Sequence, residues 1–240
     1  MIEIKNVSES YVKGNKVIDN ISLTIEDGNV FGIIGPNGAG KTTIIDMITG
    51  ILNVDEGDIF IDGKSIKKEP IEAKKGFGFV PDTPEIFEKL TGVEYLNFIG
   101  DVYNIESKTR LEKIETLAKE FGIFNNLKDR IQTYSHGMKQ KLLIISVLMH
   151  TPKNWILDEP LTGLDPKASY LLKQLMRKHA DNGNTVFFST HVLDVAEKIC
   201  DKIAVIDKGK IIFIGTVEEL KEKSKTNSSL EESFLRIIEE

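Results

Sequence analysis

The stretch "GPNGAGKTT", residues 35–43, decides the fold class of this 240-residue chain. It satisfies the pattern G-x-x-x-x-G-K-[S/T], and it lies between an apolar run at 30–34 and an apolar helical stretch. In such a loop, glycines let backbone N–H groups face phosphate oxygens, a lysine reaches the terminal phosphates and a hydroxyl can bind Mg²⁺. The sequence therefore predicts a nucleotide-binding phosphate loop made of Gly35, Pro36, Asn37, Gly38, Ala39, Gly40, Lys41, Thr42 and Thr43.

Strand and helix patterns alternate on both sides of this loop. Stretches 2–7 and 21–25 alternate in polarity, with a Gly14–Asn15 turn between them, which is typical of antiparallel strands. Continuous apolar runs follow, as expected of strands buried on both faces, and helical periodicity separates several of them. This order predicts an α/β fold with a mixed, largely parallel sheet. Further strands are expected at 30–34, 57–63, 76–81, 155–157, 185–190, 202–207 and 210–215, and helices at 44–52, 92–105, 108–121, 167–180 and 192–200.

The helical stretches between 83 and 150 interrupt the strand pattern. We expect one domain over residues 1–240, in which a core lobe (1–82 and 151–222) contains an N-terminal antiparallel β-subdomain and carries an inserted helical lobe (83–150). A polar stretch precedes a final tail helix at 230–239. The helix at 108–121 is expected to bury one face, formed by Leu111, Ile114, Leu117, Ala118 and Phe121.

Two adjacent carboxylates end one of the buried strands. Asp158 follows the apolar run in "WILDEP" (155–160), at the sheet edge where it would meet Mg²⁺ beside the phosphate loop. Glu159 comes next, and consecutive strand residues point to opposite faces unless the chain turns there, which Pro160 suggests. A carboxylate near the terminal phosphate is suited to activate an attacking water as a general base, so Glu159 and Lys41 are the candidate catalytic pair.

Two other features have no unique interpretation from the residues alone. His191 ends the run "FFSTH", and its position leaves a catalytic and a structural role open. Ser135 is a good N-cap for a helix whose first turn carries a glycine, Gly137, and such a helix start can receive an anion. The same residues also fit an ordinary capped helix.

The bulk composition limits the classes of partner. A net charge of −6 and a pI near 5.4 argue against broad attraction to nucleic acid or to anionic lipid. A single cysteine, Cys200, excludes an internal disulfide. The N-terminal residues alternate like a strand rather than a signal peptide, and no apolar stretch is long enough to span a bilayer. We expect a cytoplasmic protein.

Together these motifs resemble the ATP-binding-cassette (ABC) ATPase family, over essentially the whole chain. Residues 35–42 resemble its Walker A loop, 154–159 its Walker B strand and 161–166, with Asp165, its D-loop. The resemblance implies that His191 is the switch histidine and that Tyr11 stacks on adenine. It implies ATP and Mg²⁺ as cofactors, with Thr42, Asp158 and Asp82 as the residues near the metal.

Residues 134–138, "YSHGM", fall at the family signature, usually written LSGGQ. In this family the signature of one subunit closes over the γ-phosphate bound by another, so the resemblance implies ATP-driven head-to-tail dimerisation through Ser135, His136, Gly137 and Met138. His136 and Met138 replace the usual glycine and glutamine, and Asp82 stands where the family commonly has a Q-loop glutamine. The role of that glutamine is therefore not transferred directly to Asp82.

The combination of "YSHGMKQKL" and "PDTP" looks most like the single-domain ATPases of bacterial drug, bacteriocin or ion exporters. This resemblance implies a membrane permease on a separate chain, a homodimer or a dimer with a related ATPase, and a position on the inner face of the membrane. The alternative is an ABC ATPase that acts as a clamp on nucleic acid or ribosomes; the 92 residues between Gly40 and Thr133 are too few for its usual coiled coil, and no nucleic acid is expected. A small-molecule kinase or GTPase would leave Asp165 and His191 without a role.

Overall fold

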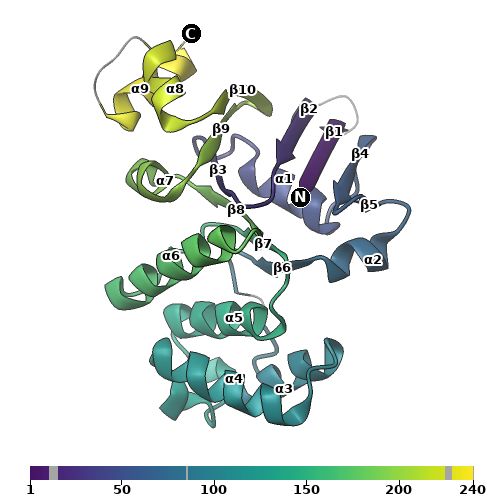
Figure 1. The fold of residues 1–240 in the computed structure, drawn as a ribbon, viewed down its shortest axis with the longest axis vertical. Helices are drawn as coiled ribbons and strands as arrows, with labels where there is room; N and C mark the ends of the chain where they lie inside the picture. Colours follow the sequence, from purple (N-terminus) through teal and green to yellow (C-terminus); the bar gives the residue numbers. More distant parts are fainter. Residues whose placement is uncertain (11–15, 85, 225–228, 240) are drawn as a thin grey trace.

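A computed structural model describes residues 1–10, 16–84, 86–224 and 229–239 (Figure 1). The strands are β1 (Ile2–Glu9), β2 (Ile18–Ile25), β3 (Val30–Ile34), β4 (Glu56–Ile61), β5 (Lys64–Ser65), β6 (Phe77–Val80), β7 (Asn154–Leu157), β8 (Thr185–Thr190), β9 (Lys202–Asp207) and β10 (Lys210–Gly215). The helices are α1 (Lys41–Thr49), α2 (Pro70–Lys75), α3 (Gly92–Val102), α4 (Ser107–Glu120), α5 (His136–His150), α6 (Pro166–Asp181), α7 (Leu193–Ile199), α8 (Val217–Lys223) and α9 (Leu230–Glu239), with 3₁₀ turns at Phe124–Asn126 and Ile131–Thr133.

The strands form two sheets, and both predicted kinds of pairing are confirmed. The larger sheet has the order β10-β9-β3-β8-β7-β6 and is parallel except at β10. The smaller sheet has the order β2-β1-β4-β5 and is antiparallel. Because β3, β7 and β8 are buried along their whole length, they lie in the interior of the larger sheet, and their carboxyl ends meet at one edge.

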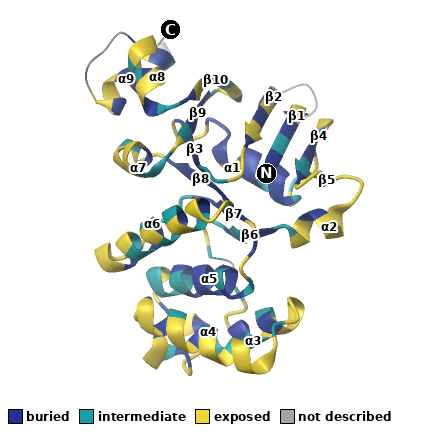
Figure 2. Ribbon diagram, viewed as in Figure 1, coloured by how far each residue is buried: buried dark blue, intermediate teal, exposed yellow. Residues whose placement is uncertain are grey.

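Figure 2 shows the central strands as buried, and alternate residues of these strands belong to two different cores. Ile156 and Phe187 pack with α1 and the smaller sheet, whereas Leu157 and Phe188 pack with α5, α6 and the other helices of the 92–150 region. This period of two is what a strand covered on both faces produces. The larger sheet therefore joins the antiparallel subdomain to the helical region.

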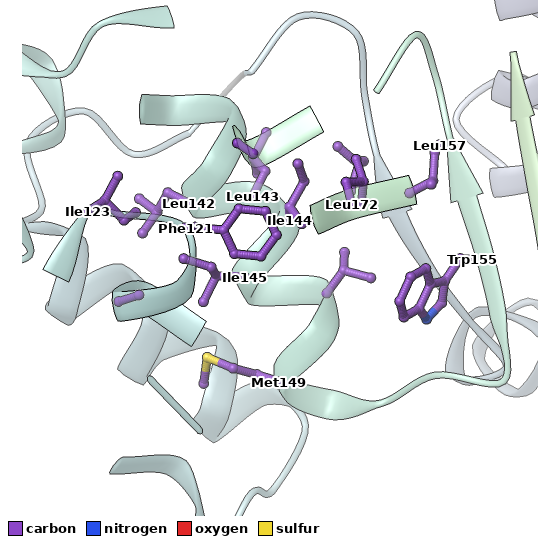
Figure 3. Packing of buried hydrophobic residues seen from close by; sticks show 14 of the residues in the cluster. Phe121, Ile123, Leu142, Leu143, Ile144, Ile145, Met149, Trp155, Leu157 and Leu172 are labelled. Atoms are coloured by element: carbon purple, nitrogen blue, oxygen red, sulfur yellow. The ribbon is translucent and has the colours of Figure 1, made fainter. Parts of the chain in front are cut away.

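The α5 helix forms the centre of the second core. Leu142, Ile145 and Met149 are fully buried, and Figure 3 shows Phe121 lying among the side chains of α5, with Leu172 and Leu157 to their right. The expected buried face of α4 is confirmed at Ile114 and Ala118, but Leu111 is 60% exposed.

Several boundaries differ from the sequence prediction. The first helix ends at Thr49 because Gly50 adopts a left-handed C-cap, so Ile51 and Leu52 lie outside it. The short elements β5, α2 and α8 were not predicted. The β9–β10 hairpin turns at Lys208–Gly209, both with positive φ. The predicted Gly14–Asn15 turn lies outside the described residues.

The C-terminal helix packs on the core lobe rather than extending away from it. Leu230 and Ile237 of α9 are buried against Leu220 of α8 and Ala196 of α7, and the Arg236 guanidinium donates to the Ser224 carbonyl oxygen at 3.3 Å. Across the described residues, none of the helices is both long and apolar enough to cross a membrane.

Candidate functional site

The phosphate loop connects β3 to α1 and leaves the start of that helix uncapped. Gly40, the N-cap of α1, has a φ of 110° and provides no side-chain hydrogen bond, so the first backbone N–H groups are available to an anion. Gly35 is required by close packing, since a Cβ there would lie 2.3 Å from the Ile206 carbonyl oxygen. The loop borders a cavity of about 450 Å³, hereafter the nucleotide cavity.

The nucleotide cavity collects side chains that are distant in sequence. It is lined by Val17, Asn37, Gly38, Gly40, Lys41, Thr42, Thr43, Asp82, Glu159, Thr162 and His191. Most of the predicted phosphate-loop residues, together with Glu159, His191 and Asp82, are therefore brought together. Gly35, Pro36 and Ala39 belong to the same loop but do not line the cavity. Tyr11, predicted to stack on adenine, lies outside the described residues.

Lys41 is a buried cation at the end of the phosphate loop, where α1 begins. Its side chain is 7% exposed, and its Nζ donates to the carbonyl oxygens of Gly35 at 2.8 Å and Pro36 at 3.2 Å. Burial lowers the pKa of Lys41, and the charges of Glu159 and Asp158 oppose that shift. The Lys41 ammonium is thus hydrogen-bonded to neutral carbonyl oxygens. A bound phosphate would give this buried ammonium a negatively charged partner.

Asp158 follows β7 at its carboxyl end and lies next to Thr42. It is 2% exposed, and it accepts hydrogen bonds from the Thr42 and Ser189 hydroxyls. Burial raises the pKa of Asp158, the two hydrogen bonds oppose that rise, and the carboxylates of Asp82 and Glu159 reinforce it. A cation would relieve this concentration of negative charge.

The donor chemistry at this point fits Mg²⁺, which nucleotide sites hold through a hydroxyl, one or two carboxylates and phosphate oxygens. Thr42 and Asp158 would hold the ion, and Asp82 lies close enough to influence Asp158 electrostatically. The described residues contain no cluster of three or more His, Cys, Asp or Glu side chains suited to binding a metal without a nucleotide.

Glu159 leaves the strand by an unusual backbone turn. It has a φ of 44°, a left-handed conformation that costs a non-glycine residue about 1 kcal/mol. The turn directs Glu159 into the nucleotide cavity, while the preceding Asp158 remains behind Thr42. The predicted turn is thus present, at Glu159 itself, one residue before Pro160. The Glu159 Oε1 atom then lies 2.9 Å from Nδ1 of His191, the residue that follows β8.

The signature segment, residues 134–138, lies at the start of α5 and does not line the nucleotide cavity. Ser135 caps the helix by accepting from the Met138 N–H at 3.3 Å, as predicted, and both Ser135 and His136 are exposed. Gly137 packs against the D-loop: a Cβ at this position would lie 2.5 Å from the Gly163 carbonyl oxygen. The segment is therefore an open helix start whose geometry the D-loop supports.

Asp165 of the D-loop also lies away from the nucleotide cavity. Its carboxylate caps α6 by accepting from the Ala168 N–H at 3.0 Å, and it forms an ion pair with Lys141 of α5. Within the chain, Asp165 therefore connects the D-loop to the helix that carries the signature segment. Thr162 of the same loop does reach the cavity.

Three polar or cavity-lining residues were missed from the sequence. Asp46 lies one turn after Thr42 on α1, and burial together with Asp158 raises its pKa. Val17 lines the cavity from a segment close to the undescribed residues. Ser189 hydrogen-bonds to Asp158, and the only signal for it was a hydroxyl directly after the apolar residues of the strand run.

Known proteins are similar to this chain in sequence and in fold. The sequence model of the ABC transporter family matches residues 18–162. In Bacillus subtilis (strain 168), the uncharacterized ABC transporter ATP-binding protein YhcH is 39% identical over 220 residues, 91% of this chain and 71% of its own length. The ABC-type transporter ATP-binding protein EcsA is 33% identical over 241 residues, 100% of this chain and 97% of its own.

The same organism's linearmycin resistance ATP-binding protein LnrL is 34% identical over 245 residues, 99% of this chain and 78% of its own length. A solved structure of an ABC transporter's ATP-binding subunit superposes with a TM-score of 0.93 at 29% identity and covers 99% of both chains. The family match, the relatives and the cavity all agree. This chain belongs to the ABC transporter family, and it is an ATP-binding subunit that hydrolyses ATP.

Proposed function

We propose that this ATPase powers a separate membrane permease, in the direction of export, through ATP-driven head-to-tail dimerisation with a second cassette. One observation carries the proposal: the signature segment presents an exposed helix start, and none of its residues lines the nucleotide cavity of its own chain. A helix start of this kind attracts phosphate. In a head-to-tail pair, each signature segment would complete the partner's nucleotide cavity.

Within each cavity the residues would divide the work. Lys41 and the phosphate-loop N–H groups bind the ATP phosphates, and Thr42 and Asp158, with Asp82 nearby, hold Mg²⁺, which neutralises phosphate charge when bound. Glu159 is the general base for the attacking water, and His191, at 2.9 Å from it, orients that carboxylate. The signature residues Ser135, His136, Gly137 and Met138 and the D-loop Asp165 act across the dimer interface.

A groove in the helical lobe supports docking of a membrane subunit. It is lined by Pro84, Ile86, Phe87, Glu88, Tyr95 and Ile99, and it begins two residues after Asp82. The exposed rings of Phe87 and Phe98 form an edge-to-face pair beside it, with centroids 5.6 Å apart. Exposed apolar side chains gathered in this way indicate an interaction site. We therefore place the permease contact on the helical lobe (83–150), next to Asp82.

The export direction and the location rest on the relatives. LnrL is named for linearmycin resistance, which is consistent with removal of a toxic compound from the cell. We propose that the chain lies on the cytoplasmic side, peripheral to the inner face of the cell membrane, where ATP is available.

Glu159→Gln tests the dimer. The substitution removes the base but keeps the shape of the side chain, so we expect ATP binding to persist while turnover falls about 10²–10⁴-fold. The slowed enzyme should accumulate as a dimer in ATP and as a monomer without it, as measured by light scattering during gel filtration. Glu112→Gln, an exposed glutamate on α4, is the matched control. A variant that binds ATP yet remains monomeric would contradict the proposal.

Membrane recruitment needs a separate test. The tagged chain, expressed in a cell with its neighbouring membrane protein, should sediment with the membrane fraction. Phe98→Ser should reduce that recovery, whereas Leu111→Ser, which changes a more exposed apolar side chain on α4, should not. Recovery of ribosomes or DNA instead of membrane would favour the clamp function.

A further inference from the structure

We propose that Ser189 is a positioning residue that fixes both Asp158 and Glu159, the adjacent metal-binding and base residues. The inference rests on the proposed roles of those two carboxylates. Ser189 lies on β8, is fully buried, and is two residues before His191. Its hydroxyl donates to Asp158 Oδ1 and accepts from the Glu159 backbone N–H at 2.9 Å.

The Ser189 hydroxyl replaces a backbone acceptor at the point where the hydrogen-bonded pairing of β7 and β8 ends. The last residue pair between these strands is Leu157 with Phe188, so Ser189 stands beside Asp158. The Asp158 N–H continues the ladder on the other side by donating to the Val80 carbonyl oxygen at 2.8 Å. The next N–H, that of Glu159, faces β8 and finds the Ser189 side chain instead of a backbone acceptor. Ser189 thereby satisfies a group that the chain reversal would otherwise leave unpaired.

The direction of both hydrogen bonds is fixed by chemistry. A backbone N–H can only donate, so Ser189 must accept from Glu159 through a lone pair. The single hydroxyl proton is then free to point at Asp158, which accepts it. Ser189 therefore holds Oδ1 of the Asp158 carboxylate and does not occupy Oδ2.

The same hydroxyl stabilises the strained turn at Glu159. A φ of 44° is unfavourable for glutamate, and such conformations persist when surrounding contacts determine them. The contact to the Glu159 N–H lies at the pivot of that turn, so its loss allows the Glu159 side chain to leave its position beside His191. A serine that only satisfied its own polar atom would have neither effect.

The experiment compares Ser189→Ala and Ser189→Cys with the wild type. Alanine removes the hydroxyl, and cysteine keeps a side chain of similar shape with a much weaker donor. Ser146→Ala is the matched control: this buried serine donates to the Leu143 carbonyl oxygen of α5 and hydrogen-bonds to Tyr95 of α3, and neither partner lines the nucleotide cavity. Asp158→Asn and Glu159→Gln serve as references for the two carboxylates, and circular dichroism verifies folding.

Two readouts are used. The first is the affinity for Mn²⁺, a spin-active substitute for Mg²⁺, measured by electron paramagnetic resonance with a non-hydrolysable ATP analogue. The second is ATP turnover at saturating nucleotide. Partners that orient a metal ligand contribute about 10–100-fold in metal affinity or activity, so we expect at least a tenfold loss of Mn²⁺ affinity and of kcat in both Ser189 variants, and none in Ser146→Ala.

The outcomes separate the inference from the proposed function. If the Asp158 and Glu159 variants lose activity but folded Ser189 variants keep Mn²⁺ affinity and kcat within twofold of the wild type, the positioning role is wrong. If the Asp158 and Glu159 variants themselves behave like the wild type, the assignment of the two carboxylates fails first. Should alanine prevent folding, the cysteine variant decides by the same criterion.

Discussion

The nucleotide cavity and the signature segment both present a helix start to an anion, yet they are built in opposite ways. In the cavity, Lys41 and Asp158 are 7% and 2% exposed, and both are held by hydrogen bonds to neighbouring groups. In the signature segment, Ser135 and His136 are exposed, and the cap is a single 3.3 Å hydrogen bond. The first site is enclosed by its own chain, and the second is open.

This difference indicates how the two sites divide the ATPase function. Buried charges must be paired, so the cavity residues are fixed before nucleotide arrives. The signature segment buries no charge, and its N–H groups remain solvated until something covers them. We infer that the cavity supplies binding and chemistry, and that the signature segment supplies closure when a second subunit approaches.

The largest expected effect on ATPase activity comes from placing a defect in each of the two sites, on different chains of a dimer. Lys41→Ala removes the buried cation of the nucleotide cavity. Gly137→Ala changes the signature segment, because the new Cβ would lie 2.5 Å from the carbonyl oxygen of Gly163 in the D-loop. Each variant alone should lose ATPase activity, because every composite site in a symmetric dimer then contains a defect. In an equal mixture half of the dimers are mixed and contain one intact site, so about a quarter of the wild-type sites should be restored.

That mixing experiment is measured by single-turnover hydrolysis, which requires only one working site per dimer. Gly137→Ala alone should still bind ATP, and circular dichroism should show that both variants are folded. A mixture no more active than the sum of its components would mean that the signature segment acts within its own chain, and the contrast between the two sites would be lost.

His191→Ala tests whether the enclosed site is a working unit. It removes the contact at 2.9 Å that orients the Glu159 carboxylate. We expect turnover to fall about 10²-fold, at the lower end of what a positioned acid–base pair contributes, with ATP affinity nearly unchanged. Steady-state kinetics and nucleotide titration measure the two quantities separately. Equal turnover in variant and wild type would assign His191 a structural role only.

Asp82→Gln should have a smaller effect, of about two- to fivefold. Asp82 lines the nucleotide cavity, and its charge raises the pKa of the Asp158 carboxyl, which indicates like-charge repulsion. Because a bound cation would relieve that repulsion, removing the Asp82 charge should weaken Mg²⁺ binding in the nucleotide complex, as measured by titration with a fluorescent analogue at several Mg²⁺ concentrations. If neither the Mg²⁺ dependence nor coupling to the membrane subunit changes, Asp82 does not act at the metal.

The smallest effect concerns the open site itself. Ser135→Ala removes the N-cap of α5, and we expect a loss of about 1 kcal/mol in the free energy of unfolding. Ser135→Gly costs only a few tenths of a kcal/mol in the free energy of unfolding, so this variant isolates the functional role of the hydroxyl. Urea denaturation measures stability, and ATP-dependent dimerisation measures function. Dimerisation that follows stability alone in the two variants would leave the Ser135 hydroxyl without a direct role.

The sequence determined most of the elements and part of the site. The strands at 30–34, 185–190, 202–207 and 210–215 have the predicted bounds, because continuous apolar runs flanked by turn residues have few other structures available. The phosphate loop was also readable, since a glycine-rich turn between a strand and a helix is a local feature. Short elements such as α2 and β5 were not, because they are stabilised by contacts rather than by periodicity.

Only the tertiary structure decided how distant residues meet. No pattern near Leu111 predicts its exposure, because burial depends on which elements lie above it. The hydroxyl bridge from Ser189 to Glu159 and the packing of Gly137 on Gly163 each join segments about 25–30 residues apart. The left-handed turn at Glu159 depends on such surrounding contacts. Sequence patterns report the local preferences of the chain, whereas a hydrogen bond between two strand ends exists only after the sheet has brought them together.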